Sequence, residues 1–149
     1  MWVSRRTDYA TRAVLVLAMA DLDEPMRAEE LSRRTQVPQS VLEQIMPIMR
    51  NDGLVRSERG RYGGYVLNHP PADITMERVV RLFEGQLAPI GCATRQAPEP
   101  CPMEVECSLR FVWEDVRDAI IDRLSATTFA DLAARAGGPW RNPEQLEPV

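Results

Sequence analysis

The sequence predicts a mainly α-helical protein with one small β-hairpin. Two short helices, Ala28–Thr35 and Gln39–Asn51, flank a tight turn and precede two short strands joined by a glycine-rich turn. A later run, from residue 108 onward, has apolar residues at helical spacing. This order of elements is typical of a winged helix-turn-helix followed by a long dimerisation helix.

The elements of the first region follow from local signals. A first helix, capped by Thr7 or Ser4, runs to about Ala20, and the acidic, proline-containing segment 21–25 ends it. Strands are expected at residues 54–58 and 64–68. The third helix should bury one apolar side, made of Val41, Leu42, Ile45, Ile48 and Met49. We assign residues 1–70 to a winged helix-turn-helix DNA-binding domain.

A second region, residues 71–135, holds a loop and the long helix. A fourth helix runs from Met76 to Glu84, and residues 88–107 then lack periodicity and carry all three cysteines. The long helix has a wide apolar stripe that must be buried, and the same helix of a second subunit is the economical partner. The stripe comprises Leu109, Val112, Trp113, Val116, Ala119, Ile120 and Leu124.

The C-terminal end combines a short helix and a tail. Thr128 and Asp131 have capping-box spacing and predict a helix from Phe129 to Ala136. Residues 136–149 are polar and proline-rich, and we expect a loose tail.

Composition and charge narrow the classes of function. The chain has 149 residues, of which 44% are apolar and 27% charged, as in an ordinary soluble domain and not a disordered or membrane-spanning chain. The net charge is −4, but residues 1–68 alone are slightly basic, so only this half is suited to phosphates. With one histidine and no nucleophile–base set, the sequence does not predict an enzyme or a small-molecule substrate. The apolar run at residues 13–20 is too short for a secretory signal, and we expect a cytoplasmic protein with no membrane partner.

The third helix and the hairpin carry the candidate DNA contacts. The N-terminal part of a recognition helix reads base edges, and here it presents Gln39, Ser40, Glu43 and Gln44. The glycine-rich hairpin tip carries Arg59 and Arg61, which are suited to a minor groove. Each feature alone is common on solvated surfaces. Their combination at this spacing predicts binding to double-stranded operator DNA.

The three cysteines form the second candidate site. Cys92, Cys101 and Cys107 are separated by eight and five residues in a proline-rich loop, unlike a zinc ribbon or a Cys-x-x-Cys redox pair. Thiolates from such a loop can hold an iron–sulfur cluster. Two alternatives stay open: a metal-free regulator that senses oxidants through its thiols, and a zinc-stabilised adaptor whose winged unit binds protein.

These residues resemble the Rrf-type winged helix-turn-helix iron–sulfur transcription regulators, the family that includes IscR, NsrR and RirA. The resemblance covers residues 1 to about 135. Its carriers are the Thr-Asp-Tyr-Ala start at residues 7–10, Val-Leu-Glu-Gln-Ile at 41–45, Gly-Leu-Val at 53–55, the wing pattern at 59–65 and the three-cysteine loop. It implies a homodimeric repressor whose cluster reports iron, nitric oxide or redox state, and a 4Fe–4S cluster is expected rather than 2Fe–2S.

The chain departs from the family pattern at two places. The first cysteine gap has eight residues instead of the five of the IscR-like and NsrR-like pattern, and Arg110 stands where IscR-like members have a histidine ligand. The resemblance therefore points to Asp8 as the fourth ligand, because the matching position in NsrR-like proteins supplies a carboxylate from the partner subunit. Which signal is sensed, and whether the cluster-loaded or cluster-free form binds DNA, stays open.

Overall fold

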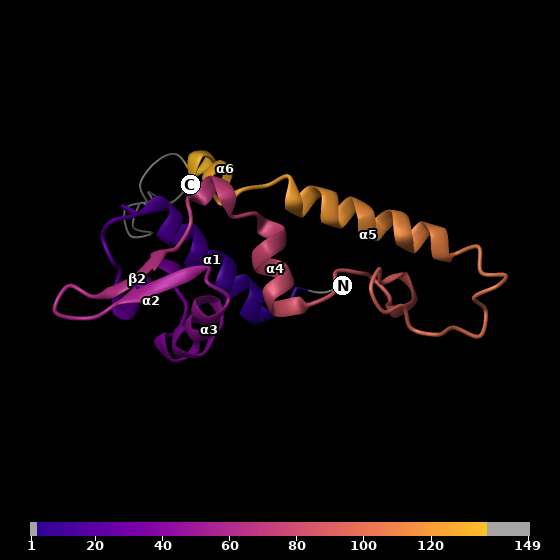
Figure 1. The fold of residues 1–149 in the computed structure, drawn as a ribbon, viewed down its shortest axis with the longest axis horizontal. Coiled ribbons are helices and arrows are strands. Elements are labelled where there is room, and N and C mark those ends of the chain that lie inside the picture. The colour runs from indigo at the N-terminus through magenta and orange to yellow at the C-terminus, as the bar shows by residue number, and fades with distance from the viewer. Residues whose placement is uncertain (1–2, 137–149) are drawn as a thin grey trace, which may run out of the picture.

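The structure, a computed structural model, describes residues 3–136 (Figure 1). The predicted tail lies outside these residues apart from Ala136. The helices are α1 Arg5–Met19, α2 Ala28–Thr35, α3 Gln39–Asn51, α4 Met76–Glu84, α5 Arg110–Ser125 and α6 Phe129–Arg135, and the strands are β1 Val55–Glu58 and β2 Gly64–Leu67. Two short 3₁₀ turns are η1 Pro71–Asp73 and η2 Gly91–Ala93. The predicted class, mainly α with a small hairpin, is confirmed.

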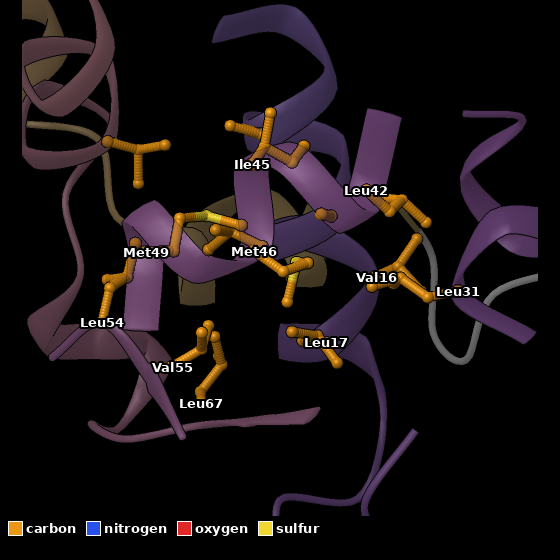
Figure 2. Close-up of a cluster of buried hydrophobic side chains, with 14 of the residues drawn as sticks. Val16, Leu17, Leu31, Leu42, Ile45, Met46, Met49, Leu54, Val55 and Leu67 are labelled. Atoms are coloured by element: carbon orange, nitrogen blue, oxygen red, sulfur yellow. The ribbon is translucent and has the colours of Figure 1, made fainter. Parts of the chain in front are cut away.

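A single apolar core lies around α1, against which α2, α3, α4, α6 and the hairpin pack (Figure 2). On α3 the fully buried side chains are Leu42, Ile45, Met46 and Met49, which follow the i, i+3, i+4, i+7 spacing of one helix face. The sequence-based prediction was wrong at Met46, which it omitted. It also included Ile48, which is only half-buried because it lies beside that face.

The hairpin is joined to the segment before α2. β1 and β2 are antiparallel, with Val55 opposite Leu67 and Glu58 opposite Gly64. An isolated bridge then pairs Tyr65 with Met26 through two backbone hydrogen bonds of 2.9 and 2.8 Å. A Cβ atom on Gly64 would lie 2.5 Å from the Met26 carbonyl, so only glycine permits this approach. The sequence did not predict this bridge.

Helix α5 extends away from the part of the molecule formed by α1, α2, α3 and the hairpin, whereas α6 lies beside that part (Figure 1). Thr128 and Asp131 form the predicted capping box, and Thr128 bridges to Thr75 beside α4. Phe129 is 1% exposed in the core. By contrast, no residue of α5 is buried, and its packing partners are α4 and η2. In the single chain the long helix therefore leaves most of its apolar stripe exposed, and its burial by a second subunit stays a prediction. None of the helices in residues 3–136 is both long and apolar enough to cross a bilayer.

A carboxylate from α4 holds the first turn of α1. Ser4 caps α1 by accepting the Thr7 N–H, so of the two predicted candidates Ser4 is the cap. The Glu84 carboxylate accepts the Ser4 N–H at 2.8 Å and the hydroxyl of the buried Thr7. Desolvation acts to raise the pKa of Glu84, but the hydrogen bonds from Thr7 and Ser4 outweigh it and leave that pKa below its ordinary value.

Replacing Thr7 with Val should destabilise the fold by about 1 kcal/mol, because the Glu84 carboxylate then has one hydrogen-bond donor fewer. Since the folded-state pKa of Glu84 is lowered, its contribution exists above the unfolded pKa and is lost as pH falls through the folded value. The gap between wild type and Thr7→Val should therefore shrink on acidification from neutral pH. Denaturant unfolding at a series of pH values measures this difference in stability.

Thr11→Val is the control, since the Thr11 hydroxyl donates only to the Asp8 carbonyl of its own helix. An equal, pH-independent loss in both variants would contradict the assignment.

Candidate nucleic-acid interface and cysteine loop

The polar edge of α3 faces solvent along its N-terminal half. Gln39, Ser40, Glu43 and Gln44 are all exposed, on the side opposite the buried face. The Gln39 amide donates to the Glu43 carboxylate at 3.2 Å, which preorders both side chains. These groups supply hydrogen-bond donors and acceptors of the kind that read base edges in a major groove.

The wing tip is a tight turn that exposes two arginines and a tyrosine. Gly60 has a φ of +107°, and the Gly63 N–H closes the turn on the Gly60 carbonyl at 3.1 Å. Arg59 and Arg61 are exposed, and within residues 3–136 neither forms an ion pair. Their charge is therefore available to a phosphate backbone.

Tyr62 is a further candidate for the DNA interface that the sequence reasoning did not name. The residue is 81% exposed, and the Arg61 guanidinium lies over its ring, 5.9 Å from the ring centroid. An aromatic residue between the arginines and glycines of a hairpin tip was the available signal. The tip thus offers a flat ring and two cations at one point.

Cys92 lies in a segment that α5 holds firmly. The Arg117 guanidinium, only 11% exposed, donates to the Ala93 carbonyl at 2.6 Å and to Asp118 at 2.7 Å. Asp118 also binds Arg95 at 2.7 Å. The hydrogen bonds from Arg117 and then Arg95 lower the pKa of Asp118 to about 2. The Asp118 carboxylate that binds both arginines therefore stays charged at any physiological pH.

Cys101 and Cys107 lie in the outer part of the loop, where the backbone makes local turns. The Glu104 N–H donates to the Cys101 carbonyl at 3.1 Å, and the Glu104 carboxylate binds Arg110 at 2.6 Å. All three cysteines are free and half-buried. In residues 3–136 no group of three or more His, Cys, Asp or Glu side chains is arranged to hold a metal ion. Three thiols are the donor type that iron–sulfur clusters use, so the residues suit such a cluster chemically.

Asp8 faces solvent on the first turn of α1. Its carboxylate is 45% exposed and pairs with Arg12 at 2.7 Å, one helical turn further along. Any ligand role for Asp8 therefore competes with this ion pair.

The helices α2 and α3, with one buried face and one exposed polar edge, lie beside a hairpin that carries arginines at its tip. This arrangement defines a winged helix-turn-helix protein. Comparison with known families identifies it more closely: the model of the Rrf2 family, described as iron-dependent transcriptional regulators, matches residues 3–135. The chain belongs to the Rrf2 family of winged helix-turn-helix transcriptional regulators, and the family is one of regulators and not of enzymes.

Individual relatives cover nearly the whole chain. The chain is 31% identical to the HTH-type transcriptional regulator CymR of Bacillus subtilis, over 93% of this chain and 94% of that protein. It is 30% identical to the HTH-type transcriptional repressor NsrR of Streptomyces coelicolor, over 93% of each.

Among solved structures, IscR of T. potens aligns with a TM-score of 0.73 at 26% identity, over all of this chain and 94% of that one. The oxidized form of CymR from Staphylococcus aureus aligns with a TM-score of 0.71 at 29% identity, over 89% and 96%.

Proposed function

We propose that the chain is a homodimeric, operator-binding transcription repressor of the cytoplasm whose hold on DNA responds to an iron–sulfur cluster. The observation that carries the DNA-binding part is the joint exposure of the α3 polar edge and the uncompensated arginines of the wing tip. Gln39, Ser40, Glu43 and Gln44 read base edges in the major groove. Arg59 and Arg61 enter the adjacent minor groove.

The unpartnered face of α5 supports the homodimer. Val116 is 38% exposed, and an apolar groove of about 410 Å³ is lined by Val116, Ala119, Ile120, Arg123 and Leu124. A two-fold axis brings the same groove of a second copy against it, which buries the stripe that this chain leaves in solvent. The dimer then presents two reading heads, and operator half-sites should lie about one helical turn apart or a multiple of that.

The free thiols of Cys92, Cys101 and Cys107 support the cluster, with Asp8 of the second copy as the fourth ligand. Three thiolates from one loop are the ligand type of such clusters, which supply a centre sensitive to iron supply, nitric oxide and oxidants. Arg117 holds the Cys92 segment through the Ala93 carbonyl, so closing the site requires movement mainly of the outer loop. A carboxylate binds iron more weakly than a thiolate, which suits a cluster that must be lost or attacked on demand.

A metal-free thiol sensor is the second candidate. It is supported by the three free thiols and by similarity to CymR of Staphylococcus aureus, which has been solved in an oxidized form. Cys101 and Cys107 would then be the reacting pair. Iron and sulfide in protein purified without oxygen would exclude this candidate.

Binding of the wing to DNA is tested by replacing Arg59 with Ala. The variant should bind a duplex selected by the wild-type protein about tenfold more weakly, as expected when an arginine that touches DNA is truncated. The slope of log K against log salt should fall by about 0.9 for each phosphate that the protein no longer neutralises. Arg81→Ala is the matched control, because Arg81 lies on α4 and is paired with Glu77. Equal affinity and slope for wild type and Arg59→Ala would contradict binding of the wing to DNA.

A further inference from the structure

Arg27 joins the start of α2 to the tip of the wing, two segments 34 residues apart in sequence. Its guanidinium donates to the backbone carbonyl of Arg61, in the middle of the tip turn. This contact of Arg27 with the wing tip could not be inferred from the sequence motifs or from the pattern of exposed charges.

The neighbouring backbone reinforces the connection. Met26, the residue before Arg27, exchanges two hydrogen bonds with Tyr65 at the base of the tip. These bonds and that of Arg27 fasten the wing at two consecutive residues, immediately before the helix pair that carries the base-reading side chains. The position of the tip relative to α3 is therefore set here.

The contacts of Arg27 within its own chain indicate a structural role. Arg27 lines a cleft of about 590 Å³ together with Asp23, Glu24 and Arg61, so two carboxylates lie beside the two guanidinium groups. One nitrogen of its guanidinium donates to a neutral carbonyl, a role that depends on the reach of the side chain and the presence of a donor more than on its charge.

We propose that Arg27 is a positioning residue, which fixes the wing tip in the place from which Arg59 and Arg61 reach the minor groove. Gly60 with its positive φ and the glycines at 63 and 64 give the tip conformational freedom that binding would otherwise have to remove. The inference rests on the proposed binding of operator DNA. It predicts a loss of affinity without a loss of released counterions.

The test compares Arg27→Met with Arg27→Lys. Met keeps the length of the side chain and removes the donor, whereas Lys keeps a donor. The probe is a duplex of about three helical turns carrying the sequence that the wild-type protein selects from a random library. Arg27→Met should bind about three- to tenfold more weakly, the range for removal of one hydrogen bond, with an unchanged salt slope. Arg27→Lys should restore most of the affinity, and Arg81→Met should bind like wild type.

Two results in this assay would overturn the proposal. If the slope of log K against log salt for Arg27→Met falls by about 0.9 for each Arg27 replaced, Arg27 instead contacts a phosphate directly. Wild-type affinity of Arg27→Met shows that the bond to Arg61 does not matter for binding.

A second measurement needs no DNA. The Gly63 N–H closes the tip turn, so its hydrogen exchange should become several-fold faster in Arg27→Met. The Tyr65 N–H, bonded to Met26 at 2.8 Å, should stay protected as an internal reference. Unchanged exchange at Gly63 overturns the positioning role even if DNA binding itself fails. Failure of the wild-type protein to select any duplex counts against the proposed function and not against this tether.

Discussion

Replacing Val116 with Asp should convert the protein from a dimer to a monomer and remove most of its affinity for the operator. Val116 lies in the apolar groove of α5 and packs into no core of its own chain. In a two-fold interface the substitution counts twice, and losing two buried valines costs about 3 kcal/mol before the burial of two carboxylates is added. The dimer dissociation constant should therefore rise about a hundredfold or more. Sedimentation at a series of concentrations measures it.

The control for this experiment is Leu22→Asp. Leu22 has the same exposed fraction as Val116, 38%, but lies in the loop between α1 and α2. That variant should stay dimeric, and both variants should keep the helical content of wild type because neither side chain is buried in the core. A dimeric Val116→Asp, or a monomeric wild type that still binds a two-half-site operator with full affinity, would refute the α5 interface.

The ends of helices with local signals were predictable to within about one residue. The predicted bounds of α4 agree with the structure, where the Thr75 side chain caps the helix and Gly85, with a positive φ, ends it, and both signals act within one helical turn. The capping box of α6 is of the same kind. Which side of α3 is buried was harder to predict, since choosing Met46 over Ile48 depends on the neighbouring helices that α3 meets.

Contacts between distant segments were not predictable. The Met26–Tyr65 bridge and the bond from Arg27 to Arg61 join residues far apart in sequence, and no periodicity reports them. The paired glycines at 63 and 64 were the one trace, since a missing side chain often marks the close approach of another backbone.

The candidate sites also contain a part that the sequence could predict and a part that it could not. Exposure of Gln39, Ser40, Glu43 and Gln44 follows from helix periodicity, and it is observed. The relative positions of the cysteine sulfurs follow from no local rule, because a loop with several prolines has many backbone paths of similar energy. Spacing alone identifies the type of ligand and not its geometry.

Replacing Cys101 with Ser should abolish the iron and acid-labile sulfide of protein purified without oxygen, while wild type should be brown and contain both. Cys101 lies between the other two cysteines, so its loss leaves two thiolates, too few to retain a cluster. Iron and sulfide analysis together with the visible absorption spectrum measure the effect. Ser108→Ala, which changes a hydroxyl beside Cys107, is the matched control and should keep wild-type content.

The role of Asp8 is separated from its ion pair by a second set of variants. If Asp8 is a ligand, Asp8→Ala should lose the cluster several-fold faster on exposure to a chelator. Arg12→Ala, which removes the 2.7 Å partner and leaves the carboxylate, should retain it at least as well as wild type. Equal loss in both variants would assign the effect to the α1 surface instead of to ligation. Colourless wild-type protein with bound zinc would support the adaptor. Colourless, metal-free protein would leave the thiols of Cys101 and Cys107 as the sensing groups, because Arg117 of α5 holds the Cys92 segment through the Ala93 carbonyl.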